Sequence, residues 1–215
     1  MINSVSPNWG GARNYACRIS HSLTHQQSCT LIDACYRAIE ISVPFNRFIT
    51  INWSLLGINA NNGGFATSKF FQLARDWFRA RGYRWAWIYV REAGSKKKNK
   101  IRVPNFTNNH LHFLAHIPKE ISKDFSKQIR IWIKAIGGCK YKKGVLKTKT
   151  IGDNLDCFER YFNHYRLNLN KVLFGYLLKG ATRETAHTFG FKKFEIGGAI
   201  IGKRCGHSLN LSNGN

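Results

Sequence analysis

The sequence predicts an α+β protein in which a central antiparallel β-sheet is flanked by helices. Four segments rich in β-branched and aromatic residues have the composition of strands, and amphipathic segments with helical spacing lie before, between and after them. Two of the strands follow one another without a helix between them, which favours an antiparallel hairpin in the middle of the chain. The order β-α-β-β-α-β-α indicates a split βαβ arrangement, with helices packed on the sheet.

The N-terminal part of the chain predicts an arm, one helix and the first strand. Residues 1–20 are polar and carry no regular hydrophobic period. Apolar residues at helical spacing predict a helix over 24–41, and Pro44 prevents its continuation. Alternating β-branched and aromatic residues then predict a strand at 47–54.

The middle of the chain predicts a helix followed by the hairpin. Thr67 is a suitable N-cap for an amphipathic helix that ends at Gly82. The segments 83–92 and 108–117 both have strand composition, and the second contains the sequence "NNHLHFLAHI". The loop between them is rich in lysine and contains no acidic residue, so we expect a hairpin with a basic tip.

The last part of the chain predicts two more helices, a fourth strand and a tail. Pro118 opens an amphipathic helix that ends at two glycines, and a strand is predicted at 144–152. A further helical region covers 154–179. The chain after it is rich in glycine and in basic residues, which is typical of a tail.

Charge is the most unusual property of the composition. Thirty-four Lys and Arg residues against eleven Asp and Glu give a net charge of +23 and a pI near 10.2. Such an excess predicts a polyanionic partner, and nucleic acid held by phosphate contacts is the usual one. An anionic membrane surface is the competing interpretation, but the charge is spread along the chain rather than concentrated in one amphipathic helix.

Several classes of protein are disfavoured by the sequence. Hydrophobic residues make up 43% of the chain, which is enough for a folded core. The polar start and the lack of a long apolar run predict a cytoplasmic protein without a membrane partner. None of the six cysteines forms a CxxC pair, which argues against a zinc ribbon, and no GxxxxGK[ST] motif indicates a fused ATP-driven helicase.

Two histidines lie two positions apart in the strand predicted at 108–117. His110 and His112 therefore project from one face, with their bases ~6–7 Å apart, and can share a divalent ion. Antiparallel pairing with 83–92 brings Glu92 beside them. Two imidazoles and a carboxylate suit Mg²⁺ or Mn²⁺, which can act as a Lewis acid on a phosphate. The alternative is that the histidines are structural and that Glu92 is an exposed charge at a strand end.

A tyrosine and a lysine share one face of the last predicted helix. Tyr176 and Lys179 are three residues apart. A tyrosine can attack a phosphodiester and hold the product as a phosphotyrosine, and a nearby cation would assist this weak nucleophile. The alternative is that Tyr176 packs in the core and that Lys179 is a solvated surface charge.

Taken in order, these motifs resemble those of the HUH single-strand DNA endonucleases, named for histidine-hydrophobic-histidine. The chain is most similar to the rolling-circle replication initiators of small plasmids and filamentous phages. The resemblance covers about 47–180 and includes the "FITINW" strand, the acidic residue on a neighbouring strand, "HLH" and the later Tyr-x-x-Lys. It implies an N-terminal arm and helix over 1–46, an HUH endonuclease domain over 47–180, and a basic Gly-rich tail over 181–215 packed on that domain.

The resemblance also implies a reaction and the roles of individual residues. His110, His112 and Glu92 would bind Mg²⁺ or Mn²⁺, Tyr176 would be the nucleophile and Lys179 its helper. The reaction would be sequence-specific nicking of single-stranded DNA at an origin, leaving a 5′-phosphotyrosine and a free 3′-OH for a polymerase. Host helicase and DNA polymerase would be the partners.

Residues predicted to contact DNA are basic or aromatic. The basic candidates are Lys96, Lys97, Lys98, Lys100 and Arg102 in the hairpin tip, and Lys142 and Lys143 before the fourth strand. Trp85, Trp87 and Tyr89 could stack on bases, although a strand must also bury one of its faces in the core.

Five alternatives remain open at the level of sequence. Tyr161 and Tyr165 lie four apart and could supply the nucleophile, as in relatives with two tyrosines. His116 could be a third histidine ligand, although it lies further along the strand. A transposase or relaxase would use the same chemistry. In a non-catalytic nucleic-acid-binding protein the histidines would be structural. A histidine-metal nuclease without a covalent step would not depend on any tyrosine.

Overall fold

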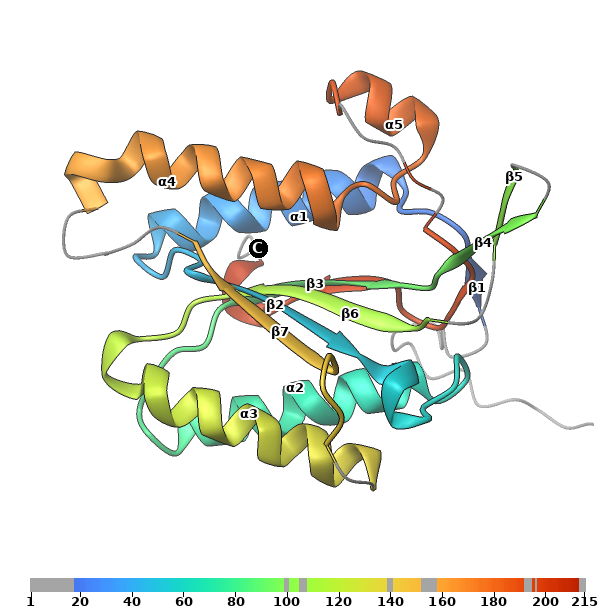
Figure 1. The fold of residues 1–215 in the computed structure, drawn as a ribbon. Coiled ribbons are helices and arrows are strands. Elements are labelled where there is room, and N and C mark those ends of the chain that lie inside the picture. The colour runs from blue at the N-terminus through green and yellow to red at the C-terminus, as the bar shows by residue number, and fades with distance from the viewer. Residues whose placement is uncertain are drawn as a thin grey trace, which may run out of the picture.

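Five antiparallel strands form one sheet in the computed structural model, and helices cover both of its faces (Figure 1). The fold class predicted from the sequence is confirmed. The structure describes residues 18–98, 101–104, 108–138, 141–151, 158–191, 195 and 197–212, and of 95–98, 101–104 and 158–164 it describes the backbone alone. Within these ranges, no helix has the length and apolar character needed to cross a membrane.

The strands of the sheet lie in the order β7-β2-β6-β3-β9. They are β2 (Arg47–Asn52), β3 (Trp87–Glu92), β6 (His110–Ala115), β7 (Leu146–Thr150) and β9 (Cys205–His207). Two smaller antiparallel pairs are β1 (Ile19–Ser20) with β8 (Ile200–Ile201), and β4 (Ser95–Lys98) with β5 (Ile101–Pro104). The α-helices are α1 (His25–Glu40), α2 (Gly63–Arg79), α3 (Ser122–Gly137), α4 (Phe158–Val172) and α5 (Arg183–Thr188).

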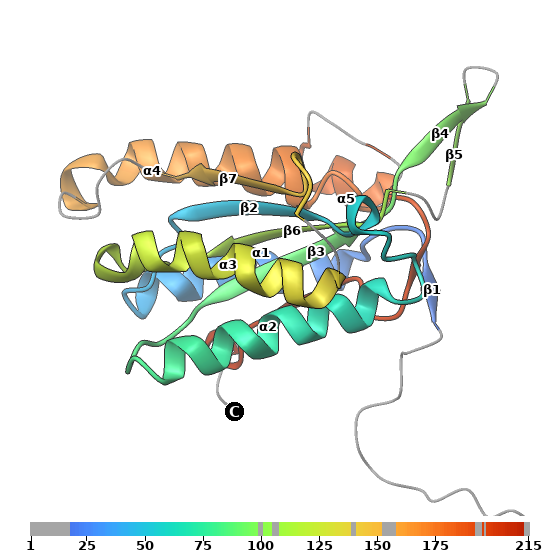
Figure 2. The same ribbon diagram turned by 60° about the horizontal axis from the view of Figure 1, so that its bottom comes forward.

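The central hairpin predicted from the sequence is present. Strands β3 and β6 pair antiparallel, with Glu92 opposite His110 and Val90 opposite His112. The basic segment between them forms the ribbon β4–β5, which projects away from the main sheet (Figure 2). Because opposite residues of an antiparallel pair point to the same face, this register places Glu92 on the face of the two histidines.

The two faces of the sheet are covered by different helices. Helices α2 and α3 pack on one face, against buried side chains that include Leu111 and Phe113 of β6. Helices α1 and α4 cover the other face, where Leu114 of β6 is buried. Strand alternation therefore turns His110 and His112 toward the side of α1 and α4.

Helix α2 begins earlier than the sequence predicts, at Gly63, so the prediction that Thr67 is its N-cap is wrong. The Thr67 side chain lies inside the helix and donates a hydrogen bond to the Gly63 carbonyl at 2.8 Å. It also accepts one from the indole Nε1 of Trp53 at 3.2 Å. Tertiary contacts have thus outweighed the local capping preference of this threonine.

The last long helix changes geometry near the predicted site. Helix α4 ends at Val172, and the chain continues as one π-helical turn over Leu173–Leu177. Leu173 and Leu177 of this turn are buried, whereas Tyr176 is 51% exposed. Such turns are frequent at functional sites, and this one contains Tyr176 and ends two residues before Lys179.

Candidate metal centre

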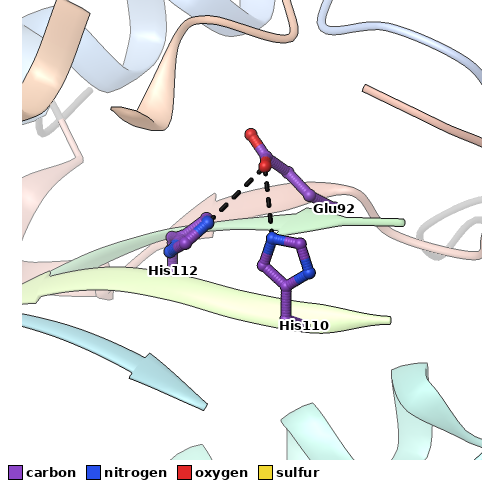
Figure 3. Close-up of side chains that lie close together, drawn as sticks. All are labelled: Glu92, His110 and His112. Atoms are coloured by element: carbon purple, nitrogen blue, oxygen red, sulfur yellow. Dashed lines mark ion pairs between the residues drawn. The ribbon is translucent and has the colours of Figure 1, made fainter. Parts of the chain in front are cut away.

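Glu92, His110 and His112 form a compact group on two neighbouring strands (Figure 3). The carboxylate Oε2 of Glu92 lies 3.3 Å from Nε2 of His110 and 3.5 Å from Nε2 of His112. One ligand atom from each residue lies within 4.8 Å of the other two. Ligands of an octahedral ion held at ~2.1 Å are ~3 Å apart, so the three atoms could bind one divalent ion after small rotations.

Hydrogen bonds made by Nδ1 orient both imidazole rings. Nδ1 of His110 donates to the Asn108 carbonyl at 2.6 Å. Nδ1 of His112 lies 2.8 Å from Oγ1 of Thr50 on β2, the residue directly opposite it in the sheet. A metal-binding histidine usually donates a hydrogen bond from the ring nitrogen that does not bind the metal. In this arrangement Nε2 of each ring is left for the metal.

Two buried atoms of the group have no hydrogen-bond partner among the described residues. They are Oε1 of Glu92 and Nε2 of His112. Their side chains are only 5% and 9% exposed. Buried polar atoms nearly always have a partner, and an unpaired one indicates a bound ion or water. These two atoms are therefore available to bind an ion or a water molecule.

The charge states of the group suit metal binding. Burial alone would raise the pKa of Glu92, but the two imidazoles and the ammonium of Lys179 outweigh it and hold that pKa well below its usual range. Burial lowers the pKa of His112, and the nearby carboxylate offsets this only in part. Near neutral pH the centre thus contains an ionised carboxylate and a neutral His112, the forms that ligate metals.

Lys179 lies directly against the carboxylate. Its Nζ is 3.2 Å from Oε2 of Glu92 and 3.4 Å from Oε2 of Glu195. Burial works to lower the pKa of Lys179, but these two carboxylates outweigh it and raise that pKa. The side chain is therefore a cation at neutral pH, and it lies two residues beyond the π-helical turn that contains Tyr176.

Phe48 packs against both Tyr176 and His112. The ring centroid of Tyr176 lies 5.5 Å from that of Phe48, which in turn lies 5.6 Å from that of His112. Tyr165, the alternative candidate, is 4% exposed within the core between α1, α4 and the sheet. Burial raises its pKa far above the usual range. The side chain of Tyr161 lies outside the described residues.

The other predicted site residues are placed as follows. His116 does not join the metal group, and its Nδ1 lies 2.8 Å from the Pro44 carbonyl. Lys142 and Lys143 are exposed just before β7. Lys100, and the side chains of Lys96, Lys97, Lys98 and Arg102, lie outside the described residues.

The three aromatic residues proposed to stack on bases belong mainly to the core. Trp85 and Tyr89 are each 7% exposed and pack with the residues beneath α2 and α3. The ring of Trp87 stacks on Phe71 at 4.1 Å between centroids. These side chains therefore face the helices on the side of the sheet opposite to the metal group.

Comparison with protein-family models, with curated proteins and with solved structures gave no match.

Sequence reasoning missed the residues that support the histidines. Thr50 and Asn108 hold the rings, and Glu195 shares Lys179 with Glu92. The signal for Thr50 was its place in the strand "RFITIN", but only the pairing of β2 with β6 puts it opposite His112. Glu195 lies outside the helices and strands, so no local periodic pattern indicates its position.

The contact between Thr50 and His112 gives a testable prediction. Thr50→Val keeps the shape of the side chain but removes the hydroxyl that holds Nδ1, so we expect Mn²⁺ affinity to fall ~10–100-fold. Thr148→Val, at an exposed position of the neighbouring strand β7, is the matched control and should bind Mn²⁺ as the wild type does. Isothermal titration calorimetry would measure both. Equal Mn²⁺ affinities for the two variants would mean that Thr50 does not support metal binding by His112.

Proposed function

We propose that this protein is a metal-dependent endonuclease that nicks single-stranded DNA through a covalent phosphotyrosine. The observation that carries the proposal is the cluster of Glu92, His110 and His112, together with the ion pair between Lys179 and Glu92. Tyr176 stands one aromatic ring away and is half exposed. These are the residues that the resemblance to the HUH endonucleases implies, and they come from three separate parts of the chain.

The chemistry follows from what these side chains can do. A bound Mg²⁺ or Mn²⁺ would polarise the scissile phosphate and neutralise charge that develops on it. Tyr176 Oη attacks the phosphorus and loses its proton to solvent, and a Tyr–O–P bond forms. The bond from phosphorus to the 3′ oxygen breaks, and that oxygen takes up a proton to give a free 3′-OH. The 5′-phosphotyrosine conserves the energy of the bond for later rejoining.

Tyr176 is the better candidate for the nucleophile on grounds of access. A nucleophile must reach the phosphate, and Tyr176 is 51% exposed whereas Tyr165 is 4% exposed. The phenol of Tyr165 would have to ionise inside an apolar core, where burial raises its pKa. Lys179, three residues after Tyr176, supplies a positive charge beside the reacting phosphate.

The charge of the chain favours a nucleic acid as substrate, and the resemblance to the HUH endonucleases implies single-stranded DNA. The net charge of +23 supports binding to a phosphate backbone, and exposed Lys142 and Lys143 lie before the edge strand β7. We infer a role in starting rolling-circle replication at a plasmid or phage origin in the cytoplasm. Because no GxxxxGK[ST] motif is present in this sequence, a host helicase would unwind the duplex, and a host DNA polymerase would extend the free 3′-OH.

The experiment that tests the proposal looks for a covalent adduct. Labelled single-stranded oligonucleotides that tile the DNA around the gene are incubated with the protein and Mn²⁺, and a denaturing protein gel is scanned for the label. We expect a labelled band that requires Mn²⁺ and disappears with EDTA. Tight, salt-sensitive binding with no labelled band for any oligonucleotide would indicate a non-catalytic nucleic-acid-binding protein.

Lys179 is predicted to act in opposite directions on catalysis and on metal binding. Lys179→Met removes a cation that is ion-paired with the Glu92 carboxylate, so Mn²⁺ affinity should rise on the order of 10-fold. The rate of adduct formation should fall ~10²-fold, because the charge beside the phosphate is lost. Calorimetry and a time course of adduct formation measure the two effects. A fall in both quantities would mean that Lys179 only supports the fold.

A further inference from the structure

The face of the sheet that contains the metal centre is closed on one side. Toward β3 and β9, the neighbour of His112 is Val90, which is 1% exposed and belongs to the core beneath α1. Ile88 and Cys205 continue this buried surface, and α1 contacts both strands. A DNA strand bound at the metal centre therefore cannot continue toward β9 without displacing α1.

The other side of the metal centre leads across β2 to the edge strand β7. His112 lies opposite Thr50 of β2, and Thr50 lies opposite Lys147 of β7. Thr50 is partly buried and Lys147 is exposed, so exposure increases from the metal centre toward this edge of the sheet. Opposite residues of antiparallel strands share a face, so all three side chains lie on the face of the metal centre. Two strand spacings, or ~10 Å, separate the backbones at His112 and Lys147.

A second lysine lies in the next row of the same face. Lys149 is exposed, and it lies opposite Phe48 of β2. Phe48 is the residue whose ring packs against both Tyr176 and His112. The edge strand thus places one lysine beside each of the two β2 residues that contact His112, and Tyr176 lies over one of them.

These two lysines are available to bind phosphate. Lys179, the cation at the metal centre, is paired with Glu92 and Glu195. The ion pairs among the described residues involve neither Lys147 nor Lys149. A lysine ammonium on its flexible side chain binds a phosphate as a point charge and does not read the sequence of bases. The open side of the metal centre therefore ends in two unpaired positive charges on the described part of β7.

We propose that Lys147 and Lys149 bind phosphates of the DNA strand next to the bond that is cleaved. The strand leaves the metal centre across Thr50 and passes over the edge strand β7. This inference rests on the proposed function, since it assumes that a single strand is bound at that centre. The two lysines hold the strand for attack by Tyr176 and take no part in the chemical step.

The test measures strand binding without any metal. A labelled oligothymidylate is titrated in EDTA at several salt concentrations and followed by fluorescence anisotropy. Lys147→Ala/Lys149→Ala should weaken binding by ~10-fold or more and reduce the salt slope by ~1.4, as expected for two lost phosphate contacts. A mixed-sequence oligonucleotide of the same length should show the same loss, because phosphate contacts do not read bases.

An exchange of two neighbouring residues separates a contact on this face from the general effect of positive charge. Thr148 lies on the opposite face of β7, across from Ile49. Lys147→Thr/Thr148→Lys therefore moves one lysine to the other face and leaves the composition and the net charge unchanged. It should weaken binding ~3-fold and reduce the salt slope by ~0.7, as expected for one lost contact. Lys69→Ala/Lys127→Ala, which removes two exposed charges from α2 and α3, should bind within ~2-fold of wild type.

The proposal makes a further prediction for the rate of adduct formation. Because the lysines bind the strand and do not act in the chemical step, a saturating concentration of oligonucleotide should restore the wild-type rate in Lys147→Ala/Lys149→Ala. A rate that stays low at saturation would overturn the proposal. Full binding by the exchange variant, or equal losses in the two double-alanine variants, would also overturn it.

Failure of this inference is distinguishable from failure of the proposed function. Each variant is also tested for Mn²⁺ binding by calorimetry, which reports that the fold and the metal centre are intact. If wild-type protein forms the covalent adduct but the lysine variants bind DNA normally, only the path over β7 is wrong. If the lysine variants lose DNA binding as expected but wild type never forms an adduct, the path stands and the nicking reaction is wrong.

Discussion

Tyr176→Phe is expected to abolish the covalent protein–DNA adduct while leaving Mn²⁺ and strand binding unchanged. The substitution removes only the hydroxyl group, and the ring can still pack against Phe48. Removal of a nucleophile that no other group replaces should lower the rate of adduct formation by at least ~10³-fold. The adduct is measured on a denaturing gel with labelled oligonucleotides, and binding is measured by anisotropy.

Tyr165→Phe and Tyr161→Phe are the matched controls. Both keep the ring and remove the hydroxyl, and both should form the adduct at a rate near that of wild type. An adduct that persists in Tyr176→Phe and is lost in one of the controls would mean that the nucleophile is Tyr161 or Tyr165 on α4. Cleavage that survives all three substitutions without any adduct would indicate a metal nuclease that uses water.

His110→Ala/His112→Ala is expected to abolish both Mn²⁺ binding and the adduct. The two imidazoles supply two of the three ligand atoms, and the sheet offers no other described group within reach to replace them. Since loss of a supporting residue alone costs ~10–100-fold in metal affinity, loss of the ligands should exceed ~100-fold. Glu92→Gln should have a comparable effect, because a neutral amide replaces the only carboxylate of the group.

His116→Ala provides the control for these ligand substitutions. His116 follows the same strand, but its ring contacts the Pro44 carbonyl and lies outside the metal group. Its removal should leave Mn²⁺ affinity within ~2-fold of wild type, although some stability is lost with the hydrogen bond. A loss of Mn²⁺ binding in His116→Ala equal to that in the double variant would favour a three-histidine site of the relaxase kind.

Much of the sheet could be predicted from sequence because its patterns are local. The segment 83–92 and the segment 108–117 are long, rich in β-branched and aromatic residues, and uninterrupted by a helix, so their antiparallel pairing followed directly. That pairing in turn placed Glu92 beside His110. The three ligand residues were therefore within reach of sequence reasoning, since period-2 alternation and one hairpin are enough to bring them together.

The remaining parts depend on contacts between distant segments. Strand β9 is the three-residue sequence Cys-Gly-His inside a Gly-rich region, with little strand propensity of its own, and it is stabilised by pairing with β3. The contact of Thr50 with His112 requires that β2 lie next to β6, which spans about sixty residues of sequence. Helix α2 begins at Gly63, because packing against the sheet outweighs the capping signal of Thr67.

The most direct test of the proposed mechanism is to map the protein–DNA link by mass spectrometry. Wild-type protein is incubated with Mn²⁺ and a cleaved oligonucleotide, then digested with trypsin and a nuclease. The proposed mechanism predicts a phosphodeoxynucleotide on the peptide of residues 172–179, VLFGYLLK, in which Tyr176 is the only tyrosine. A modified peptide of residues 161–166, YFNHYR, or cleavage of the oligonucleotide with no modified peptide, would contradict it.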